Sequence, residues 1–256
     1  MHLPILMYHS LDETGSRVSI APYTFERQLR RLRDSGYSVL PLGEALAGRA
    51  STSAARHSTP RVAALTFDDG YASVYQIAAP LLANFGWRAT LFPVSDYIGS
   101  HNQWPGQASF VPRAQLLSWT QLNELAGAGW EIGAHTRTHP DLTRLAPHEL
   151  QAEVVGGKRI LEERLGRTVD LFAYPSGRYD ARVRTTVRHH FRAACTTDMG
   201  IASETSPWDA LERIEMWDFA RPGTHWLLGS KLMSPYVAAC RAARMLKSTV
   251  TMRGIG

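Results

Sequence analysis

Short hydrophobic runs alternate with longer amphipathic stretches along most of the chain. Residues 5–8 have the pattern of a buried strand, and apolar residues at helical spacing then follow among arginines and end at Gly36. Further strands are predicted at 37–40, 62–67, 89–94, 131–134, 169–173 and 191–196. Further helices are predicted at 74–85, 119–128, 147–165 and 181–190. Because strands separated by helices of this length pair in parallel, the pattern predicts a parallel sheet built from βα units.

The number of these units indicates the fold class. With about seven βα units in 256 residues, we expect an α/β fold with one closed or partly closed barrel rather than two domains. We assign residues 1–220 to this domain, and residues 221–256 to a basic helical extension packed on or next to it. Residues 48–60 are rich in Ser, Ala and Arg without periodicity and are predicted to form a surface loop.

Carboxylates and histidines follow two of the predicted strands. Asp68 and Asp69 come after strand 62–67, and His135 and His139 come after strand 131–134. In α/β folds of this kind, reactive groups gather at the carboxyl ends of the strands. Two imidazoles and one carboxylate, with an open position, are typical ligands of a catalytic divalent metal. Since successive strand side chains point to opposite faces, one aspartate can bind the metal while the other acts on a water.

Each motif also has a simpler interpretation. Asp-Gly is a common turn signal, so Asp68 and Asp69 on their own are more typical of a turn or a helix cap. His135 and His139 on their own could be two solvated loop histidines, because Pro140 argues against a long helix there. Taken together, the strand-end carboxylates and the paired histidines favour a metal centre.

Three motifs resemble those of the polysaccharide deacetylase family, the carbohydrate esterase family 4 that shares the NodB homology domain. They are residues 66–70 (TFDDG), 135–139 (HTRTH) and 172–177 (FAYPSG). The opening residues 4–9 (PILMYH) further resemble the branch found in exopolysaccharide synthesis systems. The resemblance runs from about residue 4 to residue 216 and implies a single-domain distorted (β/α) barrel of about seven strands.

The resemblance implies a role for each motif residue. Asp68 would be the catalytic base, and Asp69, His135 and His139 would hold a divalent metal, with Zn²⁺ as the expected ion. The implied function is metal-dependent removal of N-acetyl groups from amino-sugar residues of a polysaccharide, with an exopolysaccharide as the expected substrate. The partner would therefore be an acetylated amino-sugar polysaccharide or oligosaccharide.

The third motif implies further contacts with the substrate. The backbone N–H of Ser176 would stabilise the oxyanion, and Tyr174 and Pro175 would contact the glycan. Ser176 stands where the family commonly has an aromatic residue, so stacking on a sugar is lost there. The arginine that steadies the catalytic aspartate is absent from residues 170–174, and Arg213 or Arg178 could substitute for it.

The general acid has no clear match to the family pattern. His225 is the only histidine after residue 190, and His9 ends the first strand. We therefore consider His225 or His9 as the general acid. As a third option, Asp68 acts first as the base and then as the acid. Trp104, in a loop rich in Gly, Pro and Asn, and Trp217 are the candidates for stacking on a sugar ring.

Two other functions agree with the same motifs. The enzyme could act on a different C–N bond, as in deformylation or the opening of a cyclic amide. The protein could also be a catalytically weakened glycan-binding protein, because the arginine and the acid have no clear match.

Composition and charge change this picture little. The hydrophobic fraction of 44% and the charged fraction of 20% are ordinary for a globular protein, and Cys195 and Cys240 are expected to be buried apolar residues. The net charge is +5, but residues 221–256 carry six basic and no acidic residues, so the remainder carries −1. This tail is expected to form a packed helix, and peripheral contact with an anionic membrane is the alternative. No patch of the kind that binds nucleic acid is present in the sequence.

The N-terminal residues lack the pattern of a secretory signal. If this start is native, we expect a cytoplasmic protein. No run of 18 apolar residues occurs, which argues against a transmembrane helix.

Overall fold

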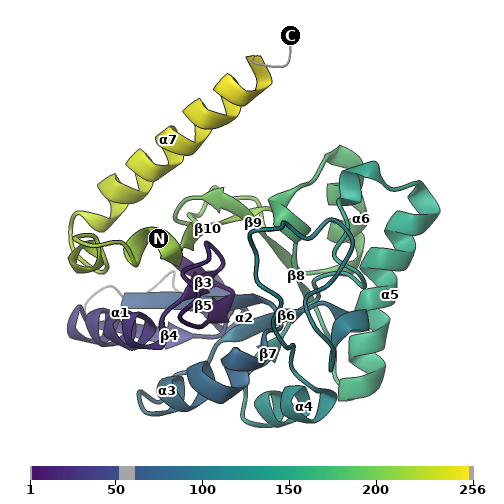
Figure 1. The fold of residues 1–256 in the computed structure, drawn as a ribbon, viewed down its shortest axis with the longest axis horizontal. Coiled ribbons are helices and arrows are strands. Elements are labelled where there is room, and N and C mark those ends of the chain that lie inside the picture. The colour runs from purple at the N-terminus through teal and green to yellow at the C-terminus, as the bar shows by residue number, and fades with distance from the viewer. Residues whose placement is uncertain (1, 52–60, 254–256) are drawn as a thin grey trace.

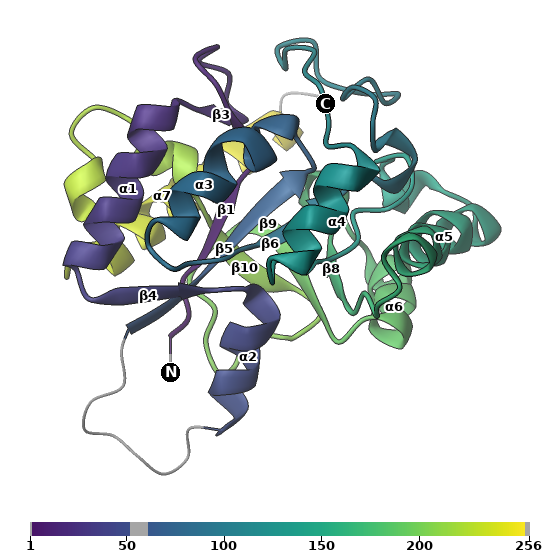
Figure 2. The same cartoon turned by 90° about the horizontal axis from the view of Figure 1, so that it is seen from below.

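Parallel strands form the centre of the molecule and helices surround them (Figures 1 and 2). The computed structural model describes residues 2–51 and 61–253, without the side chains of 49–51 and 247–253. The strands of the main sheet are β1 (Ile5–Tyr8), β4 (Tyr37–Leu40), β5 (Arg61–Asp69), β6 (Thr90–Pro93), β7 (Glu131–Ile132), β8 (Leu171–Ala173), β9 (Ala193–Met199) and β10 (Leu211–Glu215). Their order is β7-β6-β5-β1-β10-β9-β8, and β4 pairs with the first half of β5.

The two edges of this sheet approach each other and nearly close a barrel. The Ala134 N–H, just beyond β7, donates to the Leu171 carbonyl at 2.8 Å, and the Ala173 N–H donates to the Ala134 carbonyl at 3.0 Å. Every strand pair in the main sheet is parallel. The prediction of a partly closed α/β barrel of about seven strands is therefore confirmed. A separate pair, β2 (Ser10–Leu11) and β3 (Ser19–Ile20), follows β1.

The helices mostly occupy the predicted positions. They are α1 (Pro22–Asp34), α2 (Leu42–Ser51), α3 (Ala79–Ala83), α4 (Trp119–Gly127), α5 (Pro147–Leu165), α6 (Ala181–His190) and α7 (Met233–Arg253). Short helical turns are η1 (Val74–Ala78), η2 (Ser95–Tyr97), η3 (Leu142–Arg144), η4 (Pro175–Gly177), η5 (Met216–Phe219) and η6 (His225–Leu227). Because α2 continues to Ser51, the predicted loop 48–60 was wrong at its start, and residues 52–60 lie outside the described part of the chain.

The predicted helix 74–85 is not one regular helix. Its first turn, η1, is a π-helix, and the α-helical turns of α3 begin only at Ala79. Pro80 explains the change, because its ring clashes with the carbonyl four residues earlier and it has no N–H to donate. A wider π turn before the proline accommodates both effects.

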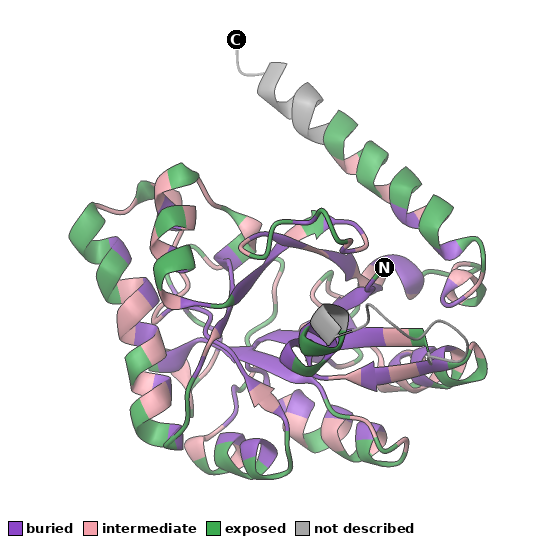
Figure 3. Cartoon of the chain, turned by 180° about the vertical axis from the view of Figure 1, so that it is seen from behind, coloured by how far each residue is buried: buried purple, intermediate pink, exposed green. Residues whose placement is uncertain are grey.

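The central strands are buried along most of their length (Figure 3). Two clusters of buried apolar side chains cover the two faces of these strands. On β5, Leu65 and Phe67 belong to the cluster under the outer helices, whereas Ala64 belongs to the cluster inside the barrel. Because strand side chains alternate, Asp68 shares the interior face with Ala64. Helix α2 closes one end of the interior with Leu42 and Leu46. The interior is therefore apolar at one end, and Asp68 lies towards the other.

The C-terminal helix packs on the domain only in its first turns. Met233 and Val237 are each 3% exposed, whereas Met245 and Leu246 are 55% and 69% exposed. The later turns of α7 project away from the barrel (Figure 1). Within the described part of the chain, no helix combines the length and the hydropathy needed to span a bilayer. The division into residues 1–220 and 221–256 stays a prediction.

Candidate active site

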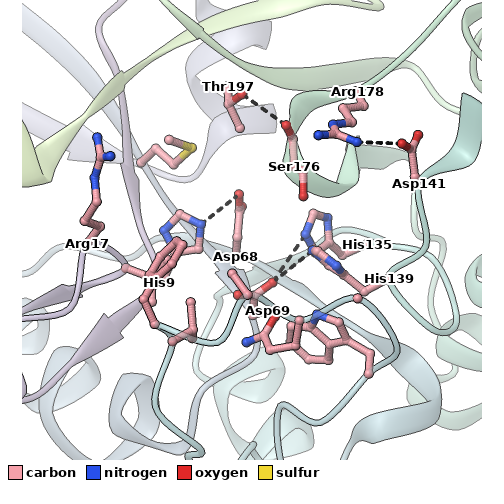
Figure 4. A pocket seen from close by; sticks show the side chains of 18 of the residues that line it. His9, Arg17, Asp68, Asp69, His135, His139, Asp141, Ser176, Arg178 and Thr197 are labelled. Atoms are coloured by element: carbon pink, nitrogen blue, oxygen red, sulfur yellow. Dashed lines mark hydrogen bonds and ion pairs between the residues drawn. The ribbon is translucent and has the colours of Figure 1, made fainter. Parts of the chain in front are cut away.

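A cavity of about 710 Å³ lies beside the carboxyl ends of β1, β5 and β10. Its lining includes Asp68 and Asp69 from the end of β5, His135 and His139 from the loop after β7, and His9 from just beyond β1. The side chains converge in the close view (Figure 4). Parallel strands thus bring together residues that lie up to 130 positions apart in the sequence, as expected for this fold class.

Asp69, His135 and His139 form one cluster of potential metal ligands. Asp69 Oδ1 lies 3.4 Å from His135 Nε2 and 3.6 Å from His139 Nε2 (Figure 4). One ligand atom from each residue lies within 4.8 Å of the others. Two imidazole nitrogens and one carboxylate oxygen on one side of a cavity leave coordination positions open, which is typical of a catalytic metal site. The three residues fit a divalent metal, and its identity as Zn²⁺ stays a prediction.

The pKa values in this cluster follow from its close packing. Burial raises the pKa of Asp69, but the hydrogen bond with His135 and the charge of His139 outweigh burial, so its pKa lies well below the usual value. Burial lowers the pKa of His135, but its contact with Asp69 and the charge of Asp68 outweigh that effect and raise it. For His139 burial dominates and lowers the pKa to about 4. Asp69 is thus ionised and His139 neutral at neutral pH, as metal ligands need to be.

Backbone strain and hydrogen bonds orient these ligands. Asp69, Thr136 and His139 have φ of 69°, 65° and 60°, a region that non-glycine residues rarely adopt. The His135 Nδ1 lies 2.8 Å from the Ala173 carbonyl oxygen, so this nitrogen carries the proton and Nε2 is left facing the cluster. The N–H of His139 donates to Thr136 Oγ1 at 3.0 Å. The turn after β7 therefore presents both imidazoles to Asp69.

Trp104 packs against one of these ligands. Its ring is stacked on the His139 ring, with centroids 4.7 Å apart, and it makes an edge contact with Tyr97. Trp104 is only 3% exposed. Trp104 lines the cavity and its ring also packs against His139, so stacking of Trp104 on a sugar stays a prediction.

Asp68 has different partners from its neighbour. Arg213 donates to both carboxylate oxygens of Asp68, at 2.7 and 2.6 Å, and is fully buried. Burial raises the pKa of Asp68, but the charge and hydrogen bonds of Arg213 outweigh it and keep the pKa below the usual value. Of the two arginines considered, Arg178 instead pairs with Asp141 at 2.7 Å. Arg213 therefore occupies the position from which the missing family arginine would act.

Only one of the two candidate acids lies at the cavity. His9 Nε2 is 3.9 Å from Asp68 Oδ2 and lines the cavity (Figure 4). His225 is not among the described residues that line it. The chain leaves the barrel after β10, and Arg31 of α1 holds the turn η6 by donating to the carbonyls of Trp226 and Leu228. The structure therefore brings His9, and not His225, to the described lining of the cavity, and the identity of the acid stays a prediction.

The third motif is only partly at the cavity. Ser176 lines it and has φ of 53°, so its backbone is held in an uncommon conformation there. Tyr174 is fully buried, and its hydroxyl donates to the Asp209 carbonyl at 2.8 Å. Among the described lining residues, neither Tyr174 nor Pro175 is present. The structure thus does not bring Tyr174 or Pro175 to the described lining, and their contact with the glycan and the oxyanion role of the Ser176 N–H stay predictions.

Comparison with known proteins identifies the family. Residues 55–192 match the sequence profile described as polysaccharide deacetylase, which is more than half of the chain. The chain belongs to the polysaccharide deacetylase family. With an Asp–His–His triad that fits a divalent metal, the protein is therefore a carbohydrate esterase family 4 enzyme, a hydrolase that acts on C–N bonds.

Two curated proteins show how far the similarity of this deacetylase extends. YxkH of Bacillus subtilis, whose name places it among polysaccharide deacetylases, is 29% identical over 215 residues, which are 84% of this chain and 71% of YxkH. The poly-β-1,6-N-acetyl-D-glucosamine N-deacetylase of Escherichia coli (strain K12) is 25% identical over 137 residues. That alignment covers 51% of this chain and 20% of the Escherichia coli protein.

Solved structures of deacetylases share the fold. The Streptococcus pyogenes deacetylase PplD, in complex with acetate, superposes with a TM-score of 0.71 at 28% identity, over 84% of this chain and 92% of that one. IcaB from Ammonifex degensii superposes with a TM-score of 0.68 at 26% identity, over 89% of this chain and 97% of that one.

Several residues at the cavity of the deacetylase were not predicted. Arg17, Glu215 and Arg244 line it beside Trp217, which was predicted. Burial raises the pKa of Glu215. The hydrophobic pattern did not predict strand β10, and without that strand nothing in the sequence places Glu215 at the same edge as Asp68.

Proposed function

We propose that this protein is a metal-dependent N-deacetylase of an acetylated amino-sugar polysaccharide, with an exopolysaccharide as its substrate. The observation that carries the proposal is the pairing of Asp68 with Arg213 directly beside the Asp69–His135–His139 cluster. A glycan-binding protein without catalysis has no need for a buried, ionised base at this point. The apparent lack of a family arginine, which favoured that alternative, is accounted for by Arg213.

Different residues are assigned to different steps of amide hydrolysis. The metal, when bound by Asp69, His135 and His139, supplies a Lewis acid for the acetyl carbonyl and for the attacking water. Asp68, held ionised by Arg213, accepts a proton as the water oxygen adds to the carbonyl carbon. The N–H of Ser176 is assigned to the negative charge that develops on the carbonyl oxygen.

The departing amine needs a proton before the C–N bond breaks. We assign this proton to His9, because its Nε2 lies 3.9 Å from Asp68 and faces the same cavity. The products are acetate and a free amino sugar, and the proton taken by Asp68 restores the protonated state of His9. Both groups lie at the same edge of the barrel, so transfer between them requires no large movement of the backbone.

The choice of an exopolysaccharide is supported by two resemblances. The matched Escherichia coli protein is named as a deacetylase of poly-β-1,6-N-acetyl-D-glucosamine. The opening residues 4–9 resemble the exopolysaccharide branch of the family, and they lead into His9 at the cavity.

A substrate panel tests this function. Metal-loaded protein would be incubated with β-1,6-linked N-acetylglucosamine oligomers, chitooligosaccharides and peptidoglycan fragments of matched length, and acetate release would be measured. We expect the highest kcat/KM on the β-1,6-linked series. Preference for peptidoglycan fragments would contradict the exopolysaccharide assignment, and release of formate or ring opening without acetate would contradict deacetylation.

A further inference from the structure

Arg17 lies at the mouth of the cavity. Among the described residues it makes no ion pair, and its guanidinium lies 5.4 Å from the centre of the Trp217 ring. Both residues line the cavity, and Arg17 is exposed. A cation held against an aromatic face is positioned at little cost in side-chain entropy, yet it keeps its hydrogen-bond donors free. Figure 4 shows Arg17 on the same side of the cavity as His9.

Two more arginines surround the residue after Trp217. The carboxylate of Asp218 is shared by Arg244, at 2.8 Å, and Arg221, at 3.3 Å. Arg221 also lies 4.4 Å from the centre of the Trp217 ring. Arg244 comes from α7 and lines the cavity. With Glu215, which also lines this wall and interacts with Arg244, two carboxylates face the three guanidinium groups of Arg17, Arg221 and Arg244. The wall therefore keeps one surplus positive charge, and Arg17 is the arginine of the three that makes no ion pair among the described residues.

The opposite wall repeats this arrangement. Asp141 is shared by Arg178, at 2.7 Å, and Arg144, at 3.4 Å, and all three line the cavity. Arg178 and Asp141 lie across the cavity from Arg17 in Figure 4. A mouth with surplus positive charge on both walls attracts anionic ligands and repels cationic ones.

We propose that Arg17 and Arg244, positioned by Trp217 and Asp218, form a subsite for an anionic group on the glycan, next to the sugar that is deacetylated. The inference rests on the proposed function for the place of that sugar. The shared chemistry of the ligand is a carboxylate or a phosphate attached to a sugar, since both accept paired hydrogen bonds from arginine. A cavity of about 710 Å³ has room for more than the acetylated residue alone.

Binding of probes without an acetyl group tests the subsite independently of catalysis. Calorimetry on the metal-loaded protein would compare a glucosyl-glucuronic acid disaccharide with its neutral methyl ester, and glucose 1-phosphate with glucose. We expect at least one anionic probe to bind about tenfold more tightly than its neutral partner, with a preference that weakens as salt is added. The pair that shows the preference identifies the carboxylate or the phosphate as the natural group.

Three variants test whether the preference for anionic probes comes from the arginines or from another source of attraction, such as the metal. Arg17→Gln and Arg244→Gln should each reduce the preference several-fold. Arg30→Gln removes an arginine that lies on α1 and pairs with Glu26 outside the cavity, and should leave the preference unchanged. Because Arg17 is exposed and makes no ion pair among the described residues, its variant should fold normally.

Equal binding of the anionic and neutral probes would overturn the subsite, and so would a preference that survives both Arg17→Gln and Arg244→Gln. In either case, release of acetate from a neutral acetylated glycan would leave the proposed function standing. Loss of that release, with the probe preference intact, would instead contradict the function and retain the subsite.

Discussion

Asp68 and Asp69 are neighbours in the sequence but face different partners. Asp68 points into the barrel and contacts Arg213, whereas Asp69 has a positive φ and meets two histidines. The turn at Asp69 is thus what gives adjacent carboxylates separate roles. The family resemblance predicted those roles, but it left Arg213 and Arg178 as equal candidates. The choice depends on contacts across 145 residues, which no local pattern contains.

Removing Arg213 should destabilise the protein strongly. Arg213→Met leaves the ionised Asp68 buried without its partner, which costs about 3–5 kcal/mol in comparable buried pairs. The free energy of unfolding would be measured by denaturant titration. Arg184→Met is the matched control, because Arg184 makes the same two-pronged contact with Asp209 but is partly exposed. That variant should lower the free energy of unfolding by about 1 kcal/mol or less. Equal losses of unfolding free energy in the two variants would show that burial of the Asp68–Arg213 pair adds nothing to its effect on stability.

Metal affinity should depend on pH through His135. Its pKa is raised above the usual 6.5 in the metal-free protein, and a protonated imidazole cannot bind a metal. Affinity should therefore rise with pH through the range around and just above 6.5. Because the pKa of His139 is only about 4, binding near pH 6 should displace close to one proton rather than two. Calorimetry in buffers of different ionisation enthalpy measures this number, and a value near two would refute the assignment.

At the scale of elements, helix α5 packs directly on the turn that carries the metal ligands. Glu153 accepts hydrogen bonds from the backbone N–H groups of Arg137 and Thr138, both at 2.9 Å. Gly157 lies against the same turn, and a Cβ there would be 2.9 Å from the carbonyl carbon of Thr136. The absence of a side chain at Gly157 therefore permits the close approach of α5 to this turn.

Gly157→Ala should consequently weaken metal binding. The new methyl group must push the Thr136 backbone, and with it His135 and His139, so we expect about a tenfold or greater loss of metal affinity. Gly156→Ala is the control, since its Cβ would meet only the flexible side chain of Arg137. Both substitutions favour the helix by about 1 kcal/mol, so any difference between them reports the contact with the turn. Equal metal affinity in the two variants would contradict this account.

The success of the prediction differs among the elements for identifiable reasons. Helices α5 and α6 have the predicted bounds, because Pro147 and Asp180 provide clear helix starts before regular apolar spacing. Strand β10 was not predicted, since the buried Arg213 places a charge at its centre. The π turn before Pro80 was not predicted because periodicity alone does not distinguish π from α turns.

At the scale of the whole molecule, the barrel brings the ends of the chain into one site. His9 lies just beyond strand β1 and Arg244 lies on helix α7, and both line the cavity with Asp68. The matched family profile ends at residue 192, so Glu215, Trp217 and Arg244 lie beyond it. Contact of the basic tail with a membrane, and a cytoplasmic location, stay predictions.

Acetate release under control of the metal tests the central claim most directly. Wild-type protein and Asp68→Asn would be stripped with a chelator, reloaded with Zn²⁺ and assayed on β-1,6-linked N-acetylglucosamine oligomers, with bound metal quantified. We predict that wild-type activity disappears on stripping and returns on reloading. Asp68→Asn should bind metal at 1:1 but lose activity by about a hundredfold or more, as expected for a lost general base. Full turnover by metal-free protein, or by Asp68→Asn, would contradict the account.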